Sequence, residues 1–259
     1  MTIRIGLCSI TYRALDAAQI VAIAARARLE SIEWGGDVHV PPGDVATARR
    51  VAALTADAGL EVASYGSYFR AGEGEDIAPV LDSAIALGAD RIRVWAGATG
   101  SSGADDAERA GVTDRLRRAA DAASAQGVSL ALEYHGDTLA DTPEATLRLL
   151  ADIDHPALSA YWQPTVGAPD EVAVAEYRAI ADRVSAMHVF SWWPRGERLP
   201  LTARDALWRG VFAAASAAPR PLRDALLEFV PEDDPAVLAR EAGTLRSLRD
   251  GAAGAGRGH

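Results

Sequence analysis

Short apolar segments rich in β-forming residues recur along the chain at intervals of 27 to 41 residues. Eight of these segments are predicted as strands, and they begin at Ile3, Ser31, Leu60, Arg91, Val128, Ala157, Val184 and Ala225. Each interval between them contains a stretch rich in Ala, Leu and Arg that is long enough for a helix. A regular alternation of strands and helices is typical of a parallel sheet covered by helices.

Residues that cap helices lie at the ends of the predicted helices. Oxygen-bearing side chains, which can accept hydrogen bonds from free N–H groups, precede four of them, at Asp16, Asp44, Thr142 and Asp170. Three glycines stand just before strands, where the left-handed residue that follows a helix is expected, at Gly59, Gly88 and Gly127.

Eight strand–helix units in 259 residues predict one α/β domain, a single (β/α)8 TIM barrel that spans residues 1–250. The alternative is an open, doubly wound sheet, which carries a glycine-rich phosphate-binding turn after its first strand. The corresponding segment here, SITYR at positions 9–13, contains no glycine. The last residues, 251–259, are rich in Gly and Ala and are predicted to form a mobile tail.

The composition narrows the classes of chemistry. All 26 basic residues are arginine, so the chain cannot supply the lysine of a Schiff-base, pyridoxal-phosphate or P-loop enzyme. The formal net charge of −10 disfavours nucleic acid as a partner. The single cysteine, Cys8, excludes an internal disulfide and a metal site built from several cysteines.

The chain begins directly with a predicted strand, without a basic segment followed by an apolar one. No apolar run reaches the length of about 18 residues that a membrane span requires. We therefore expect a soluble, cytoplasmic protein with no membrane partner. Arg-rich helices such as DRLRRAADAA, which starts at Asp114, allow polar contacts in a homo-oligomer.

Catalytic side chains of a TIM barrel lie at the C-terminal ends of the strands and in the loops that follow. Glu133, His188 and Glu228 occupy such positions in the fifth, seventh and eighth predicted strands. If they point inward, they converge on the barrel axis together with the amide oxygen of Gln163. These donors suit Mn²⁺, Mg²⁺, Co²⁺ or Zn²⁺, so we predict one divalent metal ion. The alternative is that each side chain is separately hydrogen-bonded at the barrel mouth.

Five of the six tryptophans lie at the same strand ends, at positions Trp34, Trp95, Trp162, Trp192 and Trp193. Flat indole rings can stack on the apolar faces of sugars or cyclitols, although they can also simply fill the top of the barrel. His39 and His135 lie close to these ends and are predicted either to contact a substrate or to have a structural role.

These residues resemble, in their order and spacing, the xylose-isomerase-like barrel superfamily of sugar isomerases, epimerases and related dehydratases. The pieces that carry the likeness are LALEYH, SAMHVF, LLEF and the run IEWGGDVHVPPGD, and the resemblance extends from Ile3 to about Leu248. It implies one divalent metal held by Glu, Asp, His and Glu, which carried over by position are Glu133, Gln163, His188 and Glu228. Gln163 departs from the family's Asp, and a neutral amide in that place predicts weaker metal binding.

Two branches of the superfamily fit poorly, because endonucleases use several zinc ions with more histidines and xylose-type aldose isomerases rely on a lysine. The chain looks like the ketose epimerases, in which two metal-bound glutamates move a proton on opposite faces of a carbon next to a carbonyl. The resemblance implies an isomerase or epimerase of carbohydrate metabolism, with Glu133 and Glu228 as the catalytic acid–base pair.

The predicted substrate is a small carbohydrate-like molecule, a ketose or a cyclitol. Its predicted contacts are Glu33, His39, Tyr65, Trp95, His135, Trp162, Trp192 and Arg195. Two alternatives stay open. A metal-dependent dehydratase, a lyase acting on a keto-sugar or keto-inositol, begins with the same proton abstraction. A non-catalytic sugar-binding barrel is the other, and Gln163 is the residue that favours it.

Overall fold

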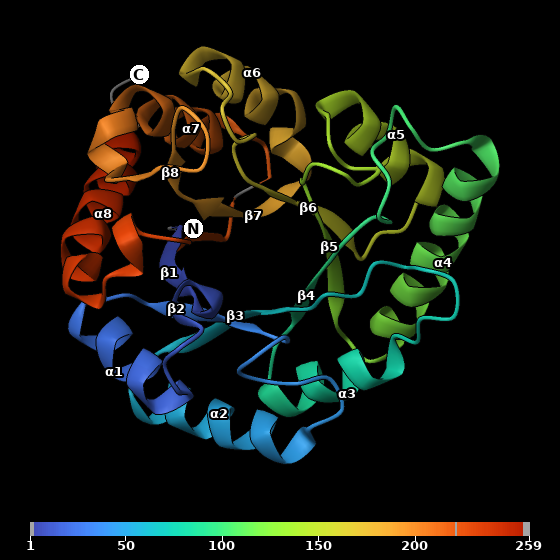
Figure 1. The fold of residues 1–259 in the computed structure, drawn as a ribbon, viewed down its shortest axis with the longest axis horizontal. Helices are drawn as coiled ribbons and strands as arrows, with labels where there is room; N and C mark the ends of the chain where they lie inside the picture. The colour runs from blue at the N-terminus through green and yellow to red at the C-terminus, as the bar shows by residue number, and fades with distance from the viewer. Residues whose placement is uncertain (1–2, 221, 256–259) are drawn as a thin grey trace.

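The structure is a computed structural model that describes residues 3–220 and 222–255, and it contains a closed barrel of eight parallel strands surrounded by eight α-helices (Figure 1). Around the barrel the strands follow the order β1-β10-β7-β6-β5-β4-β3-β2. The barrel strands are β1 (Arg4–Cys8), β2 (Ser31–Gly35), β3 (Glu61–Gly66), β4 (Arg91–Val94), β5 (Ser129–Glu133), β6 (Leu158–Trp162), β7 (Val184–Val189) and β10 (Asp224–Leu227). The helices are α1 (Ala17–Arg26), α2 (Val45–Asp57), α3 (Ala78–Leu87), α4 (Asp106–Ala125), α5 (Pro143–Ile153), α6 (Asp170–Ile180), α7 (Asp205–Ala217) and α8 (Leu238–Ala255).

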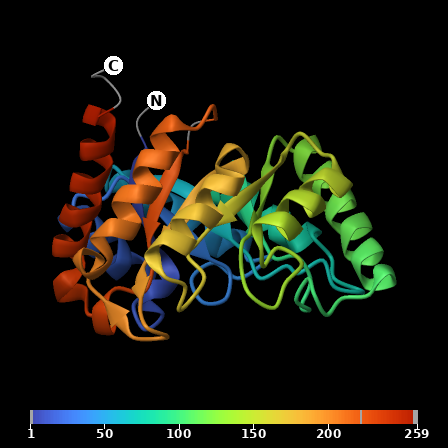
Figure 2. The ribbon, with the colours of Figure 1, turned by 90° about the horizontal axis from the view of Figure 1, so that it is seen from above.

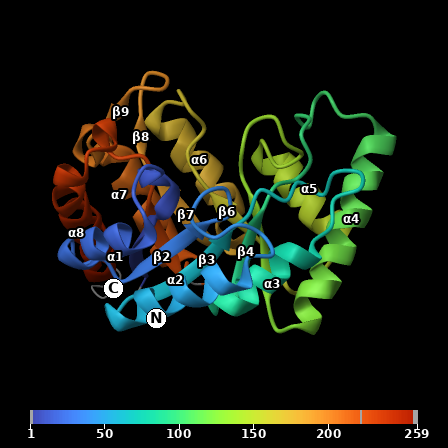
Figure 3. The same cartoon turned by 60° about the horizontal axis from the view of Figure 1, so that its bottom comes forward.

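The predicted single (β/α)8 TIM barrel is confirmed, and each predicted strand begins within one residue of an observed one. Parallel pairing of β1 with β10, from Arg4–Asp224 to Leu7–Leu227, closes the barrel. The first and last helices, α1 and α8, therefore lie side by side (Figures 1 and 3). Figure 2 shows α8 and α4 on opposite sides of the molecule.

The helix ends follow the capping residues at most predicted positions. Side-chain caps are present at Asp16, Asp44 and Thr142, and Asp16 forms a reciprocal capping box with Gln19. The glycines that precede β3, β4 and β5 all adopt the left-handed conformation, with φ of +73° at Gly59, +78° at Gly88 and +73° at Gly127.

The structure differs from the sequence expectations at three places. Asp170 is the first residue of α6 and does not cap it, because its carboxylate accepts a hydrogen bond from Arg204 Nε at 2.7 Å. The predicted tail starts at position 251, but α8 continues to Ala255 and Ala252 packs against the core, while residues 256–259 lie outside the described chain. The loop after β7 contains an unpredicted antiparallel hairpin, β8 (Ser191–Trp192) with β9 (Arg198–Leu199), seen near β7 in Figure 3.

Two apolar layers make up the core. The larger one lies between the barrel and the helices. The smaller one fills the barrel interior and consists of Ala63, Ala131, Tyr161, Ala186 and Leu226. Successive side chains on a strand point to opposite faces, so neighbouring residues at a strand end divide between the interior and the helix layer. This alternation decides which predicted site residues reach the barrel axis. Within the described chain, no helix combines the length and the apolar character needed to cross a membrane.

Candidate active site

A pocket of about 230 Å³ opens at the C-terminal end of the barrel strands. Its lining includes the buried polar side chains of Arg93, Glu133, Gln163 and Glu228. Aromatic side chains from two sides of the barrel complete it. Tyr68, Trp95 and His135 follow β3, β4 and β5, and Phe190, Trp192 and Phe229 follow β7 and β10. The pocket therefore has a charged base between two aromatic walls.

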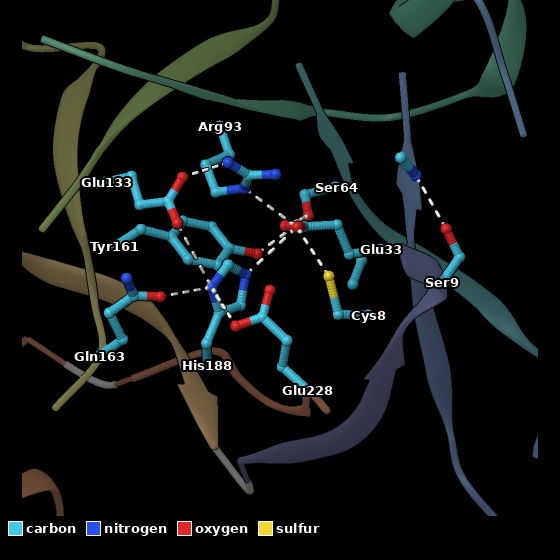
Figure 4. A network of polar contacts seen from close by, with 12 residues as sticks. Cys8, Ser9, Glu33, Ser64, Arg93, Glu133, Tyr161, Gln163, His188 and Glu228 are labelled. Atoms are coloured by element: carbon cyan, nitrogen blue, oxygen red, sulfur yellow. Dashed lines mark hydrogen bonds and ion pairs between the residues drawn. The ribbon is translucent and has the colours of Figure 1, made fainter. Parts of the chain in front are cut away.

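Four of the predicted metal ligands meet at the base of this pocket (Figure 4). His188 Nδ1 lies 3.1 Å from Gln163 Oε1, 3.5 Å from Glu228 Oε2 and 3.8 Å from Glu133 Oε1. The three oxygens and one nitrogen come from β5, the loop after β6, β7 and the residue after β10. Such a cluster of hard oxygen donors and one imidazole fits a divalent cation.

The other ring nitrogen of His188 has a different partner. His188 Nε2 lies 3.2 Å from Glu33 Oε1. The Glu33 carboxylate also accepts hydrogen bonds from Ser64 Oγ at 2.6 Å, Arg93 Nε at 3.0 Å and Cys8 Sγ at 3.3 Å. Figure 4 shows these groups side by side beneath the pocket. Each nitrogen of His188 therefore faces carboxylate oxygen.

Arg93 joins the two carboxylate groups of this network. Its Nε donates to Glu33 and its Nη1 donates to Glu133. All three side chains are almost completely buried. A buried carboxylate is costly unless a cation and hydrogen bonds compensate it, and Arg93 supplies both.

The charges of the network explain the pKa shifts. Burial acts to raise the pKa of Glu33, but Arg93 and His188 outweigh burial and hold it well below its ordinary value. Burial acts to lower the pKa of His188, but Glu228 and Glu33 raise it to about 9. Burial raises the pKa of Glu228, and the negative charge of Glu133 adds to the effect.

A charge count indicates what the cluster accommodates. Glu33, Glu133 and Glu228 carry −3 when ionised and Arg93 carries +1, which leaves −2 in a buried site. Without an ion, His188 adds +1, because its pKa is raised to about 9. A divalent cation that displaces the His188 proton would balance the −2 of the other groups. The donor set and the charge of the described residues therefore both fit one divalent ion.

Among the described His, Cys, Asp and Glu side chains, only Cys8, Glu33 and His188 form a group of three whose donor atoms all lie within 4.8 Å of one another, a spacing that Glu133, His188 and Glu228 do not reach. The group that contains Cys8 nevertheless fits a cation less well. Burial raises the pKa of the Cys8 thiol well above its ordinary value, with Glu33 adding to the shift, whereas a metal-binding cysteine must be a thiolate. The Glu33 carboxylate is already occupied by Ser64 and Arg93. We therefore place the candidate metal site on the Nδ1 side of His188.

Several predicted substrate contacts lie away from the pocket because the pleat turns them outward. Trp162 packs in a fully buried position against Tyr177 and Trp208. Tyr65 is also fully buried, and its hydroxyl donates to the Val40 carbonyl at 2.8 Å.

Three other predicted substrate contacts also lie outside the pocket, two of them in loops and one below the pocket lining. His39 bonds Ser9 Oγ through Nδ1 and the Leu15 carbonyl through Nε2, which gives it a structural position. Arg195 is exposed on the hairpin outside the pocket. Glu33 is fully buried beneath the pocket. Trp95, His135 and Trp192 do line the pocket.

The sequence prediction missed the polar side chains Arg13, Tyr68, Arg93 and Tyr161. The positions of Arg93 and Tyr161 could have been predicted from the sequence. Each is next to an apolar residue that faces the helices, so alternation along the strand directs Arg93 and Tyr161 to the barrel interior. Arg13 and Tyr68 come from loops, and they meet only in the folded chain, where Arg13 Nη2 donates to the Tyr68 hydroxyl at 2.9 Å.

Comparison with known proteins agrees with the barrel fold. A family model described as a xylose isomerase-like TIM barrel matches residues 21–214. The chain belongs to the xylose isomerase-like TIM barrel family. A curated relative, the 3-dehydroshikimate dehydratase of Bacillus anthracis, is 27% identical over 164 residues, and the match covers 59% of this chain and 59% of the relative.

Solved structures of this family share the fold across nearly the whole chain. A probable 3-DHS dehydratase from Bacillus anthracis superposes with a TM-score of 0.77 at 20% identity, covering 94% of this chain and 99% of that one. A Mycobacterium smegmatis xylose isomerase-like TIM barrel protein in complex with magnesium has a TM-score of 0.71 at 18% identity, with coverages of 97% and 98%. A D-allulose 3-epimerase from Methylomonas sp. has a TM-score of 0.67 at 19% identity, with coverages of 96% and 98%.

Proposed function

We propose that this chain is a divalent-metal-dependent enzyme that removes a proton from the carbon next to a carbonyl in a small, polyhydroxylated substrate. The observation that carries the proposal is the position of His188 Nδ1, which faces oxygens of Glu133, Gln163 and Glu228 at 3.1 to 3.8 Å. These four residues would hold the ion. When bound, it would act as a Lewis acid that polarises the substrate carbonyl.

The two glutamates supply the acid–base chemistry in this proposal. Burial raises the pKa of Glu228, so this carboxyl can hold a proton at its Oε atoms more readily than an exposed glutamate. Glu133 accepts a hydrogen bond from Arg93 Nη1, which holds its carboxylate in place as the partner base of this proposal. An acid and a base in one pocket can take a proton from a carbon and return one to it.

The aromatic walls of the pocket favour a small substrate, which is either a ring or a short chain in a compact conformation. The tilted rings of Trp95 and His135 pack with centroids 4.3 Å apart, and Trp192 packs on Phe229 at 5.3 Å. These faces exclude water from the base of the pocket, which protects a carbanionic species from unspecific protonation. His135 Nδ1 bonds the Gly136 carbonyl, so its Nε2 remains free to contact a substrate hydroxyl.

Epimerisation or isomerisation is the first candidate reaction. It requires one carboxyl to remove the proton and the other to deliver a proton to the opposite face. Glu133 and Glu228 come from β5 and from the end of β10, which are not neighbours in the barrel, and this placement supports attack from two directions.

Dehydration is the second candidate, and the similarity to the Bacillus anthracis dehydratase favours it. The same proton abstraction would be followed by loss of a β-hydroxyl as water, which gives a conjugated ketone from a saturated keto-sugar or keto-inositol and an aromatic catechol from 3-dehydroshikimate. Either of two pocket acids, Glu228 or His135, lies where it could protonate the leaving hydroxyl.

Substrate screening in deuterated buffer tests the proposal. Purified protein loaded with Mn²⁺ or Mg²⁺ would be incubated with ketoses, keto-inositols and 3-dehydroshikimate. Deuterium incorporation with stereochemical inversion identifies an epimerase. A new conjugated-ketone absorbance from a ketose or keto-inositol, or a catechol absorbance from 3-dehydroshikimate, identifies a dehydratase. Absence of divalent-ion binding, together with sugar binding but no exchange, contradicts the proposal and identifies a sugar-binding barrel.

The variant Glu228→Gln tests the acid–base assignment directly. It should retain the fold and lose exchange by at least about 100-fold, because general acid–base catalysis contributes roughly that factor. Glu232→Gln, a change on the loop after β10 outside the pocket, is the matched control. Full exchange activity in Glu228→Gln rules out the assigned role.

A further inference from the structure

The carboxylate of Glu33 takes no part in the proposed reaction, yet it has the densest set of contacts beneath the pocket. The side chain is fully buried. It accepts hydrogen bonds from Ser64 Oγ, Arg93 Nε and Cys8 Sγ, and it lies 3.2 Å from His188 Nε2. Sequence reasoning assigned it to the substrate, but it lies below the pocket lining and contacts His188 instead.

The contact matters because a neutral imidazole has one N–H group and one lone pair. When an ion lies on the Nδ1 side the ring is neutral, and the carboxylate beside Nε2 then keeps the remaining proton on that nitrogen. The lone pair then lies on Nδ1, which faces the oxygens of Glu133, Gln163 and Glu228. Only this tautomer can donate a lone pair to an ion on that side.

We propose that Glu33 is a positioning residue that holds the His188 ring and its tautomer so that Nδ1 serves as the metal ligand. This inference rests on the proposed metal site and assigns the residue that makes its imidazole competent. Glu33 acts through His188 and does not itself touch the ion or the substrate.

The surroundings of Glu33 fix it well enough for this role. Ser64 Oγ, which donates to Glu33, is also 2.8 Å from the Tyr161 hydroxyl. A Cβ atom at Gly66 would lie 2.8 Å from Glu33 Oε1 and 2.9 Å from Arg93 Nη2. The strand therefore has no side chain where the Glu33–Arg93 pair lies.

A rival arrangement uses the same atoms differently. If Cys8, Glu33 and His188 Nε2 held the ion themselves, Glu33 would be a ligand and Cys8 would be essential. The proposed arrangement uses Nδ1 of His188 as the ligand and does not require Cys8. The rival arrangement uses Nε2 and loses a ligand when Cys8 is changed.

Metal affinity separates these possibilities without an activity assay. Mn²⁺ binding would be measured by calorimetry for the wild type, Glu33→Ala, Glu33→Gln and Cys8→Ser. We expect Glu33→Ala to weaken binding by about 10- to 100-fold, the usual effect of losing a partner behind a ligand histidine. Glu33→Gln keeps an acceptor oxygen and should lose less, and Cys8→Ser should stay within about twofold.

Nitrogen NMR of the Mg²⁺-loaded protein supplies the second readout. We expect a protonated Nε2 and a ligated Nδ1 for His188 in the wild type and in Glu33→Gln. A ligated Nε2, a large loss of affinity in Cys8→Ser, or unchanged affinity in folded Glu33→Ala each overturns the inference. If Glu33→Ala does not fold, the tautomer in the wild type and the affinity of Glu33→Gln still decide it. Failure of the wild type to bind a divalent ion instead contradicts the proposed function.

Discussion

At the scale of single residues, Gln163 is where the chain departs from the Glu, Asp, His and Glu ligands that its resemblance implies. Its amide oxygen lies 3.1 Å from His188 Nδ1, so as a proposed ligand it would carry no charge. The carboxylates among the four proposed ligands, Glu133 and Glu228, then supply −2 in total. Arg93 reduces the charge felt by a cation further, because it contacts Glu133.

The isosteric change Gln163→Glu should therefore strengthen Mn²⁺ binding, by about tenfold or more, because added ligand charge tightens divalent-ion sites. Without metal it should lower the free energy of unfolding, since a further buried carboxylate has no cation. Calorimetric titration measures the first effect and urea unfolding the second. Gln126→Glu, exposed at the end of α4, adds the same charge far from the site and should change neither. Unaltered affinity in Gln163→Glu would show that position 163 is not a ligand.

Arg93 tests how much the buried ion network contributes to stability. Arg93→Met leaves Glu33 and Glu133 without their cation. We expect a loss of about 3–5 kcal/mol in the free energy of unfolding, measured in urea with a chelator present. Arg209→Met is the matched control, because Arg209 pairs with Asp205 on the surface with 68% of its side chain exposed. That control should lose less than about 1 kcal/mol. Equal losses in the two variants would contradict this account of Arg93.

At the scale of elements, the pleat of each strand decides whether a residue belongs to the site or to the core. Glu33 and Trp34 are adjacent in β2, but Glu33 points to the interior while Trp34 donates its indole N–H to Thr55 of α2. On β3 the alternation is interrupted, because Ile32 pairs with Val62 and Glu33 with Ser64, which leaves Ala63 as an extra residue. Both Ala63 and Ser64 then face the interior.

Helix ends offer an element-scale test that does not involve the site. Asp16 accepts a hydrogen bond from the Gln19 amide at 2.8 Å and forms a capping box at the start of α1. Asp16→Ala should lower the free energy of unfolding by about 1 kcal/mol, measured by urea denaturation. Asp57→Ala, at the exposed C-terminal end of α2, removes an equal charge where no cap is formed and should stay within about 0.5 kcal/mol. A larger loss in Asp57→Ala than in Asp16→Ala would contradict the role of the box.

At the scale of the whole molecule, the barrel brings together groups that are remote in the chain. His188 and Glu33 are separated by 155 positions, and their contact exists because closure of the barrel brings side chains of the unpaired strands β7 and β2 into the same interior. At the opposite end of the strands, Asp224 pairs with Arg4 and Arg91 where β10 joins β1. Stability of the whole molecule therefore depends on ion pairs that only closure creates.

The pH dependence of the free energy of unfolding should reflect His39, which lies outside the candidate metal site. Burial lowers the pKa of His39 below its ordinary value of 6.5, with the Leu15 carbonyl acting in the opposite direction. Neutral His39 makes its full contribution to the free energy of unfolding above pH 6.5. This contribution is lost as the pH falls through the folded-state pKa of His39, because the unfolded chain binds the proton more readily than the folded chain. Urea unfolding of wild type and His39→Gln between pH 7 and about pH 5 should show a shallower fall in the variant. Proton NMR titration of the His39 ring checks the cause, and a pKa above 6.5 would contradict it.

The sequence alone determined the fold class and where the barrel strands begin, because both follow from local patterns. Apolar periodicity marked the start of every barrel strand to within one residue, and capping side chains and glycines marked six helix ends. Glu133, His188 and Glu228 were found as candidates because barrel strands carry chemistry at their C-terminal ends.

Only the tertiary structure decided which side chains share an environment. Trp162 and Tyr65 were predicted at the site, yet the pleat turns them into the helix layer, where they are fully buried. Glu33 was predicted as a substrate contact, yet strand register places it behind His188. Local sequence patterns specify where strands and helices lie and how side chains alternate along a strand. Contacts across the barrel depend on strand register, bulges and closure, which involve residues far apart in the sequence.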